Sequence, residues 1–120
     1  MRTTIPAFIL FTGSLLADPT LPASASLSAF AADPAPPGSS EYFKDFRVER
    51  ADFGKILDTY FTVTREQWLH RYSPVAFGDR TGTATLKDGT ALKWLVRPGG
   101  LAAVTFPDGS TIYLAASKPE

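Results

Sequence analysis

Few side chains in this sequence are of the types that carry out chemistry. His70 is the only histidine, and it follows Glu66 by one helical turn, which supplies two metal ligands and no third. No cysteine is present, so thiol catalysis and zinc–thiolate sites are excluded. No serine stands in the G-x-S-x-G pattern that presents a nucleophile. We therefore predict no catalytic residue, no metal site and no cofactor.

The aspartates have structural explanations. Asp88 and Asp108 each precede a glycine in a tight turn, where a short carboxylate hydrogen-bonds the local backbone. Asp58 and Asp79 are candidates for a pair of hydrolytic carboxylates, but their separation along the chain does not predict the required geometry. A small-ligand binder or a minor hydrolase with a pocket near His70 is kept as the alternative function.

The overall charge excludes one class of partner. Twelve acidic and twelve basic residues are interspersed along 120 residues, so the formal net charge is zero. Without a basic patch, no long-range field draws the chain to nucleic acid. We predict no nucleic-acid binding.

The amino-terminal residues are typical of an export signal. Arg2 gives a short positive region, and an apolar run follows that is too short to span a bilayer. We predict a signal peptide over residues 1–31, cut after Ala25 or Ala31, where small residues occupy the recognition positions. The mature protein is then periplasmic or secreted, without stable membrane insertion.

Two segments follow the leader. Prolines, glycine and serines in residues 32–41 predict a disordered linker, and residues 42–120 are expected to form a single α+β domain. Residues 42–50 fit either a helix or a strand, and both remain open.

Two short helices are expected in this domain. The first is capped by Asp52 and has one apolar stripe, made of Phe53, Ile56, Leu57, Tyr60 and Phe61. The second runs from Arg65 to about Tyr72, with a capping box between Thr64 and Gln67 and a hydrophobic contact between Val63 and Trp68.

Four strand-like runs separated by turns follow, which predicts a four-stranded antiparallel meander. Three-residue loops at the two x-Asp-Gly turns place one set of apolar side chains on the inner face. At Pro98-Gly99-Gly100 a longer loop is expected, with Trp94 opposite Ala102 and positive φ at Gly99 or Gly100. The predicted inner face contains Ala84, Leu86, Leu92, Trp94, Ala102, Val104, Phe106, Ile112 and Leu114.

The outer face of this sheet is polar except near the Pro-Gly-Gly turn. There it carries an apolar patch with a cationic rim, made of Leu95, Arg97, Leu101, Ala103 and Tyr113. A patch of this kind is covered by residues 42–50 or the linker, by a second copy, or by another protein. We predict a noncatalytic interaction module of the cell envelope or secreted space that binds a protein partner or itself through these residues.

Overall fold

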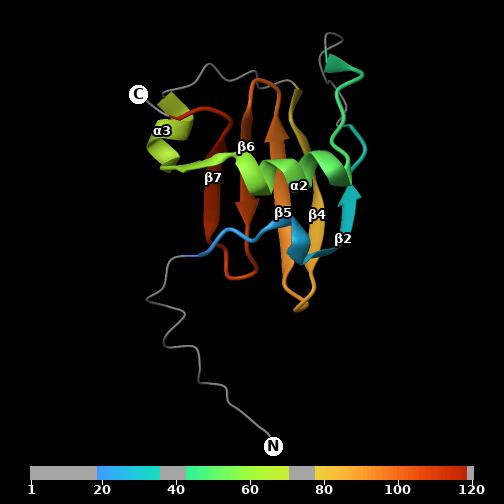
Figure 1. The fold of residues 1–120 in the computed structure, drawn as a ribbon. Coiled ribbons are helices and arrows are strands. Elements are labelled where there is room, and N and C mark those ends of the chain that lie inside the picture. The colour runs from blue at the N-terminus through green and yellow to red at the C-terminus, as the bar shows by residue number, and fades with distance from the viewer. Residues whose placement is uncertain (1–18, 36–42, 71–77, 119–120) are drawn as a thin grey trace, which may run out of the picture.

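A computed structural model describes residues 19–35, 43–70 and 78–118. These residues form an α+β fold with two α-helices and an open six-stranded antiparallel sheet of order β2-β4-β5-β6-β7-β3 (Figure 1). The helices are α2 (Arg50–Thr59) and α3 (Arg65–His70), and η1 (Ser24–Ser26) is a 3-10 turn. The strands are β2 (Leu27–Ala32), β3 (Phe61–Val63), β4 (Arg80–Leu86), β5 (Ala91–Arg97), β6 (Leu101–Thr105) and β7 (Thr111–Ala115).

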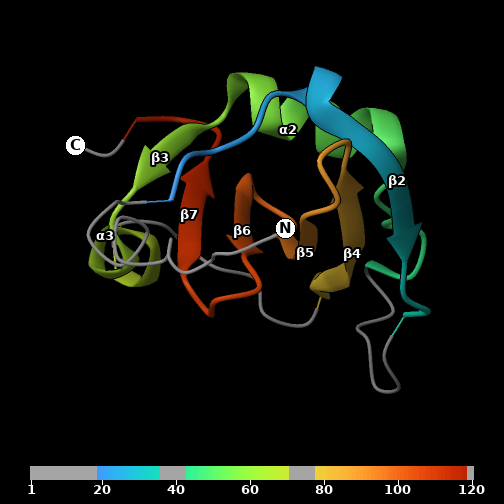
Figure 2. The ribbon, with the colours of Figure 1, turned by 90° about the horizontal axis from the view of Figure 1, so that it is seen from below.

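The α+β class and the antiparallel meander are confirmed, but the count of four strands is wrong. β4 to β7 form the expected meander, while β2 adds to one edge and β3 to the other. Figure 2 shows the sheet curving around α2, with α3 outside the arc beside β7. The inner face therefore meets α2, and the outer face meets α3 at one end only.

Two turns fix the register as predicted. Leu86 donates its amide to the carbonyl of Thr90, and Phe106 donates to Ser110, at 2.9 and 2.8 Å. Gly89 and Gly109 take positive φ values of 94° and 91°, which a side chain would disfavour. The aspartates before them accept amide hydrogen bonds from Thr90 and Ser110. Hydrogen bonds from the Thr90 and Ser110 side chains, and after them these amide bonds, lower the pKa of both carboxyls.

The Pro98-Gly99-Gly100 turn is shorter than predicted. Arg97 pairs with Leu101, and Trp94 lies opposite Val104 instead of Ala102. Gly99 and Gly100 both take positive φ, at 104° and 90°, so three residues suffice to reverse the chain. Because the shift is two residues, every side chain stays on its predicted face.

The core lies between the inner face and α2. All predicted inner-face residues are buried except Phe106, which is half-buried, and Val96 joins them. Phe53 of α2 is fully buried and its ring lies 5.8 Å from that of Trp94. The alternation of apolar and polar residues along the strands therefore predicted the core correctly.

β2 lies in the predicted signal peptide except for its last residue, Ala32. Leu27 is 4% exposed, and the Phe30 ring stacks on Trp94 with centroids 5.2 Å apart. Gly82 of β4 permits this packing, because a Cβ there would overlap the Ala31 carbonyl oxygen and the Trp94 ring. Residues 19–32 are thus part of the folded domain.

The rest of the predicted leader and linker is only partly described. Residues 1–18 and 36–41 lie outside the described residues. Of the predicted linker, Ala32 ends β2, and Asp33 donates its amide to the Thr81 carbonyl at 2.9 Å. The Thr81 hydroxyl returns a hydrogen bond to the Asp33 carboxylate at 2.9 Å. This end of the segment is anchored to β4.

α2 begins three residues earlier than predicted. Glu49 is the N-cap, and Asp52 at the third helical position completes a capping box by accepting the Glu49 amide at 2.9 Å. Asp52 as the cap is therefore wrong. Phe61 departs from the helical stripe because Tyr60 ends the helix and Phe61 starts β3.

The segment before α2 forms neither a long helix nor a strand. Arg80, only 5% exposed, donates to the carbonyls of Phe46 and Phe43 at 2.9 and 2.8 Å. Its guanidinium also lies 5.7 Å from the centre of the Phe46 ring. One buried arginine on β4 thereby fixes residues 43–46.

The capping box of α3 is confirmed. The Gln67 amide donates to the Thr64 hydroxyl at 3.0 Å, and the Thr64 amide donates to the Gln67 side chain at 2.9 Å. The helix is described to His70, and the predicted extension to Tyr72 lies outside the described residues. Within the described part of the chain, no helix is long and apolar enough to cross a membrane.

A pH titration tests whether residues before β2 are held against α2. The Ser24 hydroxyl and amide donate to the Asp58 carboxylate at 2.5 and 2.8 Å. These bonds lower the pKa of Asp58. Because its folded-state pKa is below the unfolded-state value, this contribution to stability is present at neutral pH and is lost below about pH 4.

We expect Ser24→Ala to move the pKa of Asp58 up toward its ordinary value, because the hydroxyl bond is the largest cause of the shift. Carboxyl ¹³C NMR measures this directly. Ser28→Ala is the matched control, since the Ser28 hydroxyl donates to the Thr85 and Leu86 carbonyls. An unchanged Asp58 pKa in Ser24→Ala would show that this contact is not formed.

Candidate functional site

The outer face of the sheet has three rows of side chains running across β5, β6 and β7. The covered row is nearest the Pro98 turn and contains Arg97, Leu101 and Ala115. The middle row contains Leu95, Ala103 and Tyr113. The polar row contains Lys93, Thr105 and Thr111. Exposure increases from the covered row to the polar row.

Trp68 of α3 covers the first row. Its indole N–H lies 3.0 Å from the Ala102 carbonyl and 3.2 Å from the Leu114 carbonyl, so it bonds to neighbouring strands. The ring is 6% exposed and packs with Val63, Leu101 and Ala115. The chain itself therefore covers part of the predicted patch.

Arg97 is held rigidly beside this tryptophan. Its Nε and Nη2 atoms donate to the two carboxylate oxygens of Asp79 at 2.7 and 2.8 Å. The guanidinium carbon lies 4.8 Å from the Trp68 ring centre. Hydrogen bonding to Asp79 raises the pKa of Arg97, and the side chain is 16% exposed. The arrangement is a preformed cation on an aromatic ring.

The middle and polar rows remain open. Leu95, Ala103 and Tyr113 are half-buried, and the Tyr113 ring lies 5.3 Å from that of Trp68. Together with Lys93 they line a shallow hollow of about 570 Å³, with Trp68 and Arg97 at one end. We call this open half of the outer face the outer-face hollow. Its lining consists of the middle row, the polar row, Trp68, Arg97, Asp33, Thr81, Gly82, Thr83 and Trp94.

The structure separates the five predicted contact residues into two groups. Leu95, Ala103 and Tyr113 form the middle row, and Arg97 stands at its edge. Leu101 is 1% exposed beneath Trp68, so it supports the face from below and offers no surface to a partner. The face residue that sequence reasoning missed is Trp68, whose indole reaches the sheet because β3 pairs with β7 beside it.

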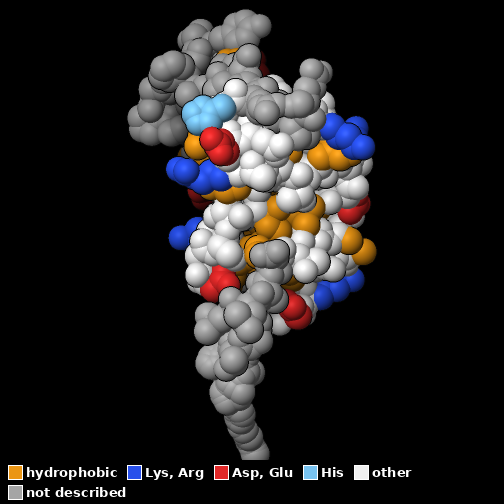
Figure 3. Space-filling model, turned by 90° about the vertical axis from the view of Figure 1, so that its left-hand side faces the viewer, with side chains coloured by type: hydrophobic (Ala, Val, Ile, Leu, Met, Phe, Trp, Pro, Cys, Tyr) orange, Lys and Arg blue, Asp and Glu red, His pale blue; other side chains and the backbone are white. Residues whose placement is uncertain are grey.

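The side of the molecule around α3 also exposes apolar surface. Phe61 and Leu69 are 39% and 40% exposed. Figure 3 shows hydrophobic side chains in the middle of this side, with acidic and basic ones around them. The described part of this side thus has the mixed character of ordinary protein surface, with no large single-sign field.

The candidates for catalysis are not brought together. His70 is exposed at the end of α3, Asp58 is bonded to Ser24, and Asp79 is bonded to Arg97. His70 does not line either of the two cavities described beside α2 and α3. Among the described residues, no group of three His, Cys, Asp or Glu side chains is placed to hold a metal ion.

Comparison with known proteins identifies no significant similarity. No protein-family model matches the chain, and neither a curated protein nor a solved structure shows significant similarity to it.

Proposed function

We propose that the protein is a noncatalytic interaction module that binds a protein through the outer-face hollow. The observation that carries the proposal is the half-exposed row of Leu95, Ala103 and Tyr113 beside the fixed Trp68–Arg97 pair. Tryptophan, tyrosine and arginine are enriched among residues that dominate protein–protein affinity. Because the anchor side chains are already fixed, binding loses less conformational entropy.

The middle row and the polar row suggest which side chains the partner contributes. An apolar side chain fits between Leu95 and Tyr113 at the Trp68 end of the hollow. The exposed ammonium group of Lys93 favours an acidic side chain beside it. The same chemistry suits a segment of another protein or of a second copy.

The proposal places this module in the periplasm or outside the cell. Its support is the positive and apolar pattern of the first residues of the sequence. Leu21 packs on the core and Leu27 is buried, so a cut after Ala25 or Ala31 removes core residues. A cut upstream of Leu21 keeps the domain whole, and Ala17 is the nearest small residue before it.

Light scattering on protein purified from its native cells tests the proposal. We expect the wild type to elute as a complex heavier than 13.0 kDa, the mass of one full chain. Ala103→Arg fills the middle of the hollow and should reduce that mass to a monomer. Ala51→Arg is the matched control, because Ala51 is exposed on α2, away from this face, and should retain the complex.

Near-UV circular dichroism shows whether both variants are folded. A complex that survives Ala103→Arg as well as Ala51→Arg would place the binding surface elsewhere. A wild type that is monomeric in the native extract would contradict the binding function itself.

A further inference from the structure

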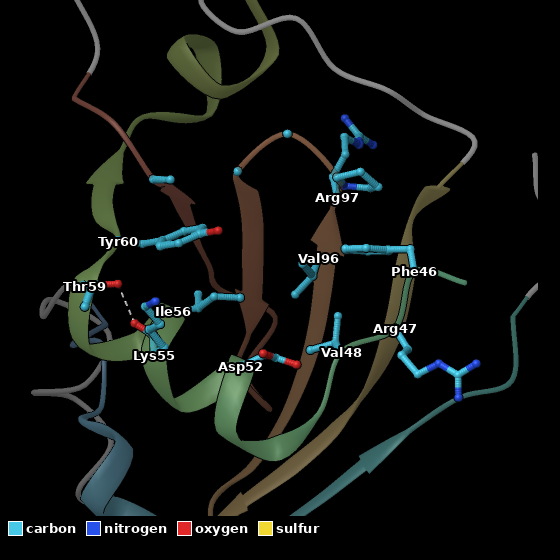
Figure 4. Close-up of a pocket in the computed structure, with 14 residues that line it drawn as sticks. Phe46, Arg47, Val48, Asp52, Lys55, Ile56, Thr59, Tyr60, Val96 and Arg97 are labelled. Atoms are coloured by element: carbon cyan, nitrogen blue, oxygen red, sulfur yellow. Dashed lines mark hydrogen bonds between the residues drawn. The ribbon is translucent and has the colours of Figure 1, made fainter. Parts of the chain in front are cut away.

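A second cavity lies on the inner side of the sheet, between α2 and the turn from β5 to β6. Its volume is about 520 Å³, and small-molecule sites commonly have volumes of roughly 300–1,000 Å³. Figure 4 shows Phe46 and Tyr60 pointing toward each other from opposite sides of it. Aliphatic side chains lie between them, from Val48, Ile56 and Val96. The interior is thus an apolar slot between two aromatic rings.

The Tyr60 hydroxyl points into this slot (Figure 4), and within the described part of the chain it has no hydrogen-bond partner. Burial raises the pKa of Tyr60, so the hydroxyl keeps its proton at neutral pH. It can both donate and accept a hydrogen bond. A tyrosine hydroxyl that is removed from water usually has a hydrogen-bond partner, and a ligand that fills the cavity would supply one.

The mouth of the cavity disfavours a cationic ligand. Arg47 and Lys55 line it, and both carry a positive charge. The one acid there, Asp52, already accepts the Glu49 amide in the capping box of α2. Arg97 lines the cavity but turns its guanidinium away, toward Asp79. A neutral or anionic polar group is therefore preferred.

We infer that this cavity binds a small, mostly apolar molecule with one neutral or anionic hydrogen-bonding group. Its ring or branched apolar part lies between Phe46 and Tyr60 over the aliphatic side chains, and its polar group bonds the Tyr60 hydroxyl. This site shares only Arg97 with the outer-face hollow and lies on the other side of the sheet, so it does not depend on the proposed protein binding.

Two matched probes test the assignment in solution. 2-Naphthol and naphthalene have the same ring system, and only the first has a hydroxyl group. We expect both to give saturable amide shifts in ¹H–¹⁵N spectra at Gly99 and Gly100, which line the cavity. One neutral hydrogen bond is worth about 1 kcal/mol, so 2-naphthol should bind roughly fivefold more tightly.

Three variants separate the contributions. Tyr60→Phe removes only the hydroxyl and should abolish the preference for 2-naphthol while naphthalene binds as before. Thr59→Trp adds a large ring at the exposed rim and should block both probes. Ala51→Trp, on an exposed part of α2 that does not line this cavity, should bind both as the wild type does.

Three results would overturn the inference. These are an absence of saturable shifts in the wild type, an unchanged probe preference in Tyr60→Phe, and wild-type binding by Thr59→Trp. Because each probe is measured on folded protein with assigned amides, a loss of structure in a variant is visible in the same spectra.

Discussion

A chain that begins at Ala32 is expected to be unfolded in water, because it lacks β2. The truncation removes Leu27, which is 4% exposed, and Phe30, whose ring stacks on Trp94. Full burial of a leucine contributes about 1.5–3 kcal/mol, and the half-buried Phe30 adds a smaller amount. It also removes the ladder between β2 and β4 and leaves a cavity beside Trp94. The total loss of stabilising free energy approaches the roughly 5–15 kcal/mol by which small domains are stable.

A graded series of starting points makes this measurement specific. A chain that begins at Thr20 keeps every described contact of Leu21, Ser24 and β2, and should unfold at the same urea concentration as the full chain. A chain that begins at Ser26 should be less stable but folded, because it loses Leu21, Ser24 and the η1 turn but keeps β2. Cooperative unfolding of the Ala32 chain at the wild-type urea midpoint would show that β2 is not part of the core.

The second large effect is expected at Trp68. Trp68→Ala should lower the free energy of unfolding by about 3–5 kcal/mol, the range for large aromatic side chains removed from a core. It exposes Leu101 and Ala115 and removes the ring on which Arg97 lies. The Ala102 and Leu114 carbonyls also lose the indole donor. Urea denaturation followed by circular dichroism measures the change.

A neighbour on the same helix provides the control for Trp68. Leu69 is 40% exposed, and Leu69→Ala should change the free energy of unfolding by less than about 0.5 kcal/mol. Equal effects of the two substitutions would mean that α3 does not dock through Trp68. The outer face would then be bare, and Arg97 would not be held on the Trp68 ring.

The meander and its core were predictable because local chemistry determines them. Asp88-Gly89 and Asp108-Gly109 are turn pairs with one dominant geometry, and the register follows from them. Once the register is known, the alternation of apolar residues assigns each side chain to a face. Even the shift at Gly99-Gly100 changed no assignment, since it moved the pairing by two residues.

The two edge strands were not predictable from local patterns. Residues 27–32 are rich in alanine and serine, so they fit a leader better than a strand, and only tertiary packing on Trp94 makes them one. Phe61 falls at the right spacing to continue the helical stripe from Phe53, yet the chain leaves the helix at Tyr60. Pairing of β3 with β7 is a long-range contact without a local signal.

The candidate site was predicted in part for the same reasons. Leu95, Ala103 and Tyr113 were found because register alone places them on the outer face. The cover over Leu101 was missed because it depends on where β3 carries α3. The bidentate contact between Arg97 and Asp79 joins residues 18 apart in sequence, and no pattern indicates it.

Photo-crosslinking in the native cells tests the binding surface most directly. p-Benzoylphenylalanine is placed at Tyr113 in the middle row, and at Ala51 on α2 as the control. We predict a discrete protein adduct from position 113, absent from position 51 and lost when Ala103→Arg is added. An absence of any adduct at position 113, or adducts of equal yield at both positions, would contradict protein binding through the outer-face hollow.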